Sequence, residues 1–309
     1  MKRLFLCLLL LMVVVLNAAE SRYLYPLATI KNSQAYDITV DAGYVFVRNQ
    51  RQIWIYNSFN AWQPRLEASF FSVHPIEDLN LQGASTLYIA SHEPTNTITP
   101  IDSLNTFGRI YFVNNIIGDK LAREGSTLYV ADRIRGIDIF NVAKGAMNDL
   151  IASFSEKWGI RDFLAEYPYL YALNDFGAVI VDVSEQDFPL SAATNYMISN
   201  AEKLLKDREY LFVAAGKELL VLSVRDIKKP TLVAQMRMPS EIQDLAIKDQ
   251  RLYLALGQGG MRIIDISVPT RMQDLNNFYP PFAVYSVALE NDFIYLGLGR
   301  EGWMIYEYR

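Results

Sequence analysis

The stretch Glu241–Pro269 reads EIQDLAIKDQRLYLALGQGGMRIIDISVP and contains the unit on which the whole chain is organised. It begins with two segments in which apolar and polar residues alternate. A Gly-rich turn, Gly257-Gln258-Gly259-Gly260, then leads into a third segment that ends in Asp-Ile-Ser-Val-Pro. Alternation with a period of two, interrupted by glycine turns, predicts short antiparallel strands joined by hairpins.

The same unit recurs seven times, and each copy has an aromatic residue after an aliphatic one in its second strand: Phe46, Tyr88, Tyr129, Tyr171, Phe212, Tyr253 and Tyr295. These anchor positions follow one another in steps of 41 or 42 residues. A repeat of about 40 to 45 residues made of short strands is typical of propeller blades. The sequence therefore predicts an all-β, seven-bladed β-propeller with four strands in each blade.

The two ends of the chain complement each other. Residues 21–30, SRYLYPLATI, look like a lone strand ahead of the first unit, and the seventh unit stops after its third strand. We expect Tyr23–Ala28 to supply the missing outer strand of the last blade. Such closure removes a sheet edge whose backbone groups would otherwise be unpaired.

Several units share a longer motif. A segment such as Leu128-Tyr129-Val130-Ala131 is followed by a Gly turn and then by Ile-x-Ile/Val-Asp-Val/Ile-Ser-x-x-Pro. This motif resembles that of the LVIVD-repeat proteins, which are bacterial exported β-propellers, and the match is best in Arg161–Pro189 and Gln243–Pro269. The resemblance implies a propeller fold and an exported location. It implies no reaction, because the family is defined by its repeat.

The first residues have the pattern of a secretory signal. A basic start, Met1-Lys2-Arg3, precedes the apolar run Leu4–Leu16 and the small residues Ala18-Ala19. We expect a signal peptide over residues 1–19 and a propeller over residues 20–309, with no transmembrane span after cleavage; an uncleaved anchor is the alternative. The only cysteine, Cys7, lies within the signal, so the mature chain has no disulfide. Together with the absence of Asn-x-Ser/Thr sequons, this favours the bacterial periplasm, cell surface or exterior.

Charge and composition exclude one class of partner. The formal net charge is −5 at pH 7, which argues against a nucleic-acid-binding protein. We expect a protein or glycan partner in the cell envelope instead.

A row of carboxylates is predicted at the channel. Near the start of each inner strand, which would line the central channel, the seven units place Asp37, Asp78, Asp119, Asp162, Lys203, Asp244 and Ser286. In the functional interpretation, the five aspartates form an acidic ring that binds a cation such as calcium, or a basic ligand. In the structural interpretation, each carboxylate accepts a backbone N–H bond between blades. No cofactor is required by either interpretation, and calcium is the weaker possibility.

Loops on the same face carry further candidates for ligand binding. The loops that join one blade to the next contain Trp158, Tyr279 and Phe282, and the Gly hairpins contain arginines, including Arg48, Arg51 and Arg300. Aromatic residues and arginine are favoured at binding hot spots. Alternatively, the aromatic side chains fill the junctions between blades. Phe59 and Trp62 form a second candidate surface.

Two functions are consistent with these residues. The chain is either a non-catalytic exported scaffold that binds a protein, peptide or glycan through its loop face, or a calcium-assisted hydrolase of the lactonase type that uses the same aspartates at the channel mouth. The two histidines, His74 and His92, have no evident serine or cysteine partner, so we assign no catalytic residue. A propeller fold hosts both functions and does not choose between them.

Overall fold

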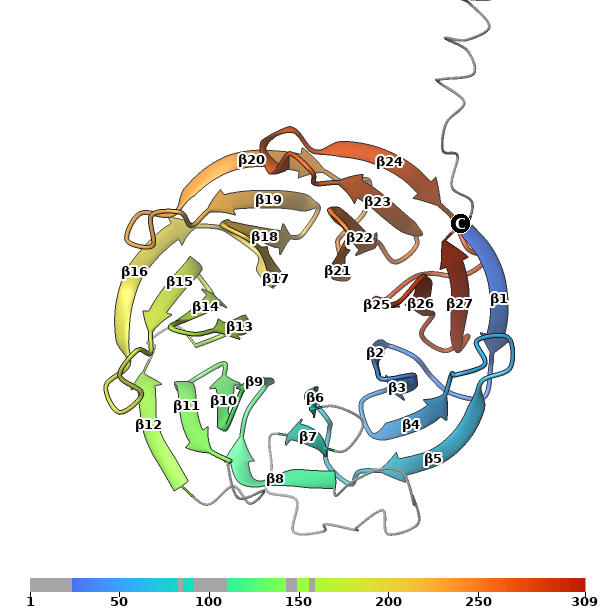
Figure 1. Cartoon of the computed structure of the whole chain (residues 1–309), viewed down its shortest axis with the longest axis horizontal. Coiled ribbons are helices and arrows are strands. Elements are labelled where there is room, and N and C mark those ends of the chain that lie inside the picture. The colour runs from blue at the N-terminus through green and yellow to red at the C-terminus, as the bar shows by residue number, and fades with distance from the viewer. Residues whose placement is uncertain (1–23, 83–85, 92–109, 143–148, 156–158, 309) are drawn as a thin grey trace, which may run out of the picture.

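The computed structural model describes residues 24–82, 86–91, 110–142, 149–155 and 159–308. The predicted signal peptide and Trp158 lie outside these residues. The described chain forms six four-stranded sheets and one three-stranded sheet, arranged radially around a common centre (Figure 1). The all-β propeller that the repeat predicts is confirmed.

The strands follow the order of the repeat. The innermost strands, which surround the channel in Figure 1, are β2 (Asp37–Asp41), β6 (Asp78–Gln82), β9 (Lys120–Glu124), β13 (Asp162–Glu166), β17 (Ala201–Asp207), β21 (Asp244–Lys248) and β25 (Ser286–Glu290). The second strands are β3 (Tyr44–Arg48), β7 (Thr86–Ser91), β10 (Thr127–Asp132), β14 (Tyr169–Asn174), β18 (Tyr210–Ala215), β22 (Arg251–Ala255) and β26 (Phe293–Gly297).

The remaining strands lie toward the rim. The third strands are β4 (Gln52–Asn57), β11 (Gly136–Asn141), β15 (Gly177–Asp182), β19 (Glu218–Ser223), β23 (Met261–Asp265) and β27 (Trp303–Tyr308). The outer strands are β5 (Arg65–Phe71), β12 (Asp149–Ser155), β16 (Leu190–Met197), β20 (Thr231–Arg237), β24 (Gln273–Phe278) and, for the last blade, β1 (Leu24–Ile30). A short 3-10 helix, Pro269–Arg271, precedes β24.

The second repeat departs from the prediction. Its strand β7 pairs antiparallel with β6 but parallel with β8 (Ile110–Ile117), where Leu87 lies opposite Ile110. Parallel neighbours need a long connection, and residues 92–109 separate these two strands in the sequence. The third strand expected at Ile98–Asp102 lies outside the described residues. The structure thus has six complete four-stranded blades rather than seven, and the second repeat contributes the three-stranded sheet.

The chain ends meet in the last blade, as predicted. Strand β1 pairs antiparallel with β27, with Leu24 opposite Tyr308 and Ile30 opposite Trp303. The register shifts between Pro26 and Ala28. Proline has no N–H to donate, and an outermost strand tolerates it because one side of that strand needs no partner. The closing strand extends two residues beyond the predicted end, to Ile30.

The core lies between neighbouring sheets. All seven anchor aromatics are buried, with exposures of 0 to 4%. In one junction, Phe212 and Leu219 from the fifth repeat pack with Leu252 and Ile264 from the sixth. Each sheet therefore shields both of its apolar faces against adjacent sheets, which leaves the polar starts of the inner strands at the channel.

Candidate functional site

All inner strands begin on one face of the ring, which we call the mouth face. The strand register identifies the residue of each repeat that occupies the mouth: it lies opposite the residue two positions after the anchor aromatic. Asp162 pairs with Leu173, Asp244 with Ala255 and Lys120 with Ala131. The mouth ring is therefore Asp37, Asp78, Lys120, Asp162, Lys203, Asp244 and Ser286.

This register corrects the predicted position of Asp119. Asp119 lies one residue before the ring position, which Lys120 takes. Successive side chains of a strand point to opposite faces, so a shift of one residue places a different side chain in the ring. Asp119 is instead buried, accepts the backbone N–H of Arg133 at 2.8 Å and lies 3.7 Å from the Arg133 guanidinium. The mouth ring has four aspartates and two lysines.

Negative and positive groups alternate over five consecutive positions of the mouth ring, from Asp78 to Asp244. The Lys120 ammonium lies 3.7 Å from Asp78 and 3.9 Å from Asp162, which belong to the sheets on either side. The Lys203 ammonium lies 3.2 Å from Asp244 of the next blade. The two lysines of the ring therefore offset part of the negative charge of the predicted acidic centre.

Four ring residues also bind the backbone of the following sheet, in bonds that we call staples. Asp78 accepts the N–H of Leu121 at 2.9 Å, and Asp162 accepts that of Leu204 at 2.9 Å. Asp244 accepts the N–H of Val287 at 3.0 Å. These three carboxylates have the geometry that the structural interpretation expects.

The fourth staple closes the ring between the last and first blades. There the Ser286 hydroxyl accepts the N–H of Ile38 at 3.1 Å and donates to Asp244 at 2.8 Å. Lys120 and Lys203 have no acceptor atom and cannot form such a bond. Their repeats are joined to the next blade by ion pairs or apolar packing instead.

Asp37 faces an arginine rather than the next backbone. Arg48 contacts the Asp37 carboxylate at 2.7 Å and donates to the carbonyls of Ile76 and Glu77, each at 2.8 Å. Burial raises the pKa of Asp37. The positive charges of Arg48, Lys203 and Lys120 lower it by a larger amount, so the pKa of Asp37 lies well below its usual range. Arg48, predicted on the basic rim, instead joins the first blade to the start of the second repeat.

The pKa values of Lys203 and Asp162 are shifted in directions that their contacts and burial explain. Asp244 raises the pKa of Lys203 above its usual range, against the opposing effect of burial. Burial raises the pKa of Asp162 and outweighs the attraction of Lys120 and Lys203 and the bond from Leu204. Lys203 therefore stays cationic over the pH range in which the protein is folded.

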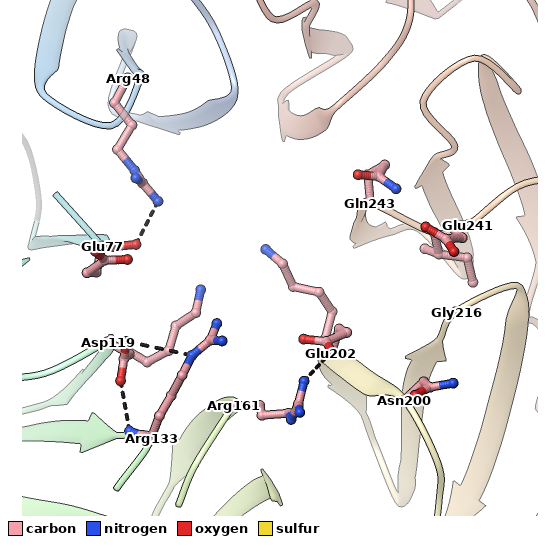
Figure 2. A pocket seen from close by; sticks show the side chains of 13 residues that line it. Arg48, Glu77, Asp119, Arg133, Arg161, Asn200, Glu202, Gly216, Glu241 and Gln243 are labelled. Atoms are coloured by element: carbon pink, nitrogen blue, oxygen red, sulfur yellow. Dashed lines mark hydrogen bonds and ion pairs between the residues drawn. The ribbon is translucent and has the colours of Figure 1, made fainter. Parts of the chain in front are cut away.

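A cavity of about 650 Å³ opens at the mouth. Figure 2 shows charged side chains converging on it from opposite sides, with Arg48 reaching Glu77, Arg133 beside Asp119, and Arg161 paired with Glu202. Asn200, Glu241 and Gln243 line another part of its wall. The cavity can accept a polar ligand, but its arginines are already held by carboxylates or carbonyls.

The carboxylates do not converge as metal ligands would. Within residues 24–82, 86–91, 110–142, 149–155 and 159–308, no three His, Cys, Asp or Glu side chains come close enough to hold a metal ion. Asp78 and Asp162 approach the same lysine from neighbouring sheets, and Asp37 is directed toward Arg48. The described ring carboxylates are therefore directed toward lysine, arginine and backbone N–H groups rather than toward one common point.

The predicted aromatic candidates have different environments. Tyr279, after β24, is 64% exposed on the mouth face. Phe282 is half-buried and packs against the apolar cluster between the last two blades. Phe59 and Trp62, at 72% and 63% exposed, lie on the opposite face, in the loop between β4 and β5. Only Tyr279 of the two described mouth-face candidates is available to a partner.

Three further observations concern the similarity of the chain to known proteins and whether its helices could span a membrane. Residues 241–278 match the family model described as "LVIVD repeat". No curated protein matches the chain. In the described part of the chain, no helix has the length and apolar character required to cross a membrane.

Solved propellers share the fold at low sequence identity. A chain of a mitotic checkpoint complex crystal structure superimposes with a TM-score of 0.68 at 11% identity, covering 92% of this chain and 95% of that one. The WD40 repeats of RRP9 give 0.65 at 10% identity, covering 93% and 97%. The computationally designed Ika8 protein gives 0.61 at 9%, covering 93% and 100%. These similarities establish the architecture alone. With the family match in its sixth repeat, the chain is a β-propeller that carries an LVIVD repeat.

Proposed function

We propose that this propeller is a non-catalytic scaffold that binds a protein, peptide or glycan on its mouth face. One observation carries the proposal: large apolar side chains stand exposed around this face beside two arginine-lined cavities, of about 650 Å³ and about 800 Å³. They come from the ends of outer strands, the loops that follow them and the hairpins between second and third strands: Tyr36, Phe71, Val73, Ile134, Phe176, Met197 and Tyr279. Exposed apolar groups interspersed with arginine are typical of binding surfaces.

The channel mouth supports a binding role over a catalytic one. A general base or nucleophile needs a group that is available to a substrate, whereas Asp78, Asp162 and Asp244 each hold a backbone N–H of the next sheet. Their lysine neighbours are held in turn by carboxylates. We propose that the mouth ring maintains the ring geometry and that the loops above it recognise the partner.

We further propose that the protein acts outside the cytoplasm of a bacterium, in the periplasm, at the cell surface or beyond it. The pattern over residues 1–19 supports this location. Sequencing the N-terminus of the protein recovered from the envelope or the medium tests it. Recovery of the protein only from the cytoplasm with residues 1–19 retained would refute it.

Affinity capture with matched variants tests the binding face. The tagged protein is incubated with an envelope fraction, and bound material is compared for the wild type, Tyr279→Ala and Phe71→Ala on the mouth face, and Phe59→Ala on the opposite face. We expect the first two substitutions to reduce capture and the third to leave it unchanged. Equal capture by all four proteins would contradict the proposal, as would a rise of several degrees in the melting temperature on adding calcium.

A further inference from the structure

A groove of about 800 Å³ lies on the mouth face where the last and first blades meet. Two arginines, Arg51 and Arg300, stand at hairpins of these two blades, and two aromatic rings, Tyr36 and Phe71, line the same groove. Tyr36 is 42% exposed and Phe71 is 62% exposed. The groove thus combines cationic forks with apolar surface that the fold leaves uncovered.

The two arginines differ from others on the mouth face. Arg48, Arg133 and Arg161 each have a carboxylate within 4 Å, whereas neither Arg51 nor Arg300 has one among the residues that the structure describes. A guanidinium offers five N–H donors in a planar fork that matches a carboxylate with two bonds at once. The groove therefore has unused capacity for anions in a chain whose net charge is −5.

The backbone holds the groove in a fixed shape. The segment before β2 pairs with the hairpin of the last blade, since Ala35 and Gly299 exchange two backbone bonds of 2.8 Å. Arg300 directly follows this bridge. The ring of Tyr36 packs against that of Tyr285, with 5.3 Å between the two ring centroids.

The hairpin that carries Arg51 is held as firmly. Asn49 accepts the N–H groups of Arg51 at 2.8 Å and Gln52 at 2.7 Å, and its amide donates to Gln34 at 3.2 Å. The carbonyl of Arg51 accepts the N–H of Ser72 at 2.7 Å, which places Phe71 beside the hairpin. A preformed site loses less conformational freedom when it binds a ligand.

We propose that this groove binds an acidic peptide segment of a partner protein, in which Asp or Glu residues alternate with aromatic or aliphatic ones. Carboxylates of the segment pair with Arg51 and Arg300, and its apolar side chains cover Tyr36 and Phe71. The Gln34 amide lies within the same groove, and its nitrogen can donate to the peptide backbone. The inference names the partner of the proposed scaffold and therefore rests on that function.

Fluorescence anisotropy tests the inference on the full-length protein. The probe is a labelled peptide of alternating Glu, Phe and Asp residues, and its neutral counterpart carries Gln and Asn instead of Glu and Asp. We expect binding of the acidic probe only, weakened by added salt. Arg51→Gln and Arg300→Gln should each reduce affinity about tenfold, which corresponds to about 1.4 kcal/mol. Arg65→Gln removes the same charge from the start of β5 on the opposite face and should have no effect.

Charge reversal supplies a second readout. The double variant Arg51→Glu, Arg300→Glu should reject the acidic probe and bind a Lys-Phe peptide, with a melting curve like that of the wild type because both side chains are exposed. Binding of the acidic probe that is unchanged in this variant would overturn the inference. So would binding of an oligosaccharide of uronic acids, but not of the peptide, at the same arginines. If both probes fail while capture still depends on Tyr279, the peptide inference falls and the proposed scaffold stands.

Discussion

Replacing Asp244 with alanine tests how far the mouth ring stabilises the propeller. The Asp244 carboxylate accepts the N–H of Val287 at 3.0 Å and the hydroxyl of Ser286 at 2.8 Å, and it faces the Lys203 ammonium at 3.2 Å. Alanine removes all three interactions at once. It leaves the Val287 N–H without an acceptor and Lys203 without its nearest anion.

The cost can be worked from these contacts. A hydrogen bond to a charged group contributes about 1.5–3 kcal/mol when buried. The side chains of Asp244 and Lys203 are 15% and 32% exposed, so solvent screens part of this energy. We expect Asp244→Ala to lower the free energy of unfolding by about 3 kcal/mol. Asp244→Asn keeps an acceptor for Val287 and loses only the charge, so we expect a loss of about 1 kcal/mol.

Thermal and urea unfolding followed by circular dichroism measure both losses. For a domain of this size, 1 kcal/mol shifts the melting temperature by roughly 2 °C, so the expected decreases are about 6 °C for alanine and about 2 °C for asparagine. Asp187→Ala is the matched control, because Asp187 is exposed in the turn before β16. If Asp244→Ala melts with the control, the staples do not stabilise the ring and the reasoning is refuted.

Three further predictions concern the closure and the acid limit of stability. Removing Leu24–Ile30 should lower the melting temperature sharply or produce oligomers, measured by calorimetry and light scattering; an unchanged monomer would contradict the role of β1. Gly302→Ala should destabilise the same blade, because Gly302 has a φ of +93° and an added Cβ would lie 1.9 Å from the Ile30 carbonyl oxygen; a wild-type melt would contradict this. Asp37 has a lowered pKa, so its stabilisation is present above about pH 4 and is lost as the pH falls below it. The urea midpoint of Asp37→Asn should therefore fall less between pH 7 and pH 3 than that of the wild type, and equal decreases would refute the assignment.

The period of the repeat predicts the architecture because it records where the chain must turn. Alternating residues between regularly spaced turns determine the strands, and the complementary ends indicate the closure that β1 and β27 form. The second repeat could not be predicted in the same way. Its third position is taken by no described antiparallel strand, and the parallel pairing of β8 depends on contacts that a local pattern does not record.

The residue types alone predict the mouth ring except at the third repeat, where the strand register decides between two adjacent residues. Asp119 and Lys120 are adjacent, and the aspartate resembles its counterparts in other repeats. The residue nine positions before Tyr129 is Lys120, and the same count leads from Tyr171 to Asp162. The count fails in the second repeat, where the ring residue Asp78 lies ten positions before Tyr88, so the strand pairing and not the count identifies Lys120. The groove of Arg51 and Arg300 joins hairpins from opposite ends of the chain, which no local pattern brings together.

The pairing of β1 with β27 makes closure of the last blade a late step of folding. Most sheets unite segments that are neighbours in the sequence, whereas the last blade is complete only when β1 meets Trp303–Tyr308 at the other end of the described chain. Until β27 is in place, the backbone N–H and C=O groups of β1 have no partner strand. A second unfolded copy offers the same strand β27, so a high protein concentration during folding favours exchange of β1 between chains. Folding at low protein concentration should therefore yield rings that are closed within one molecule.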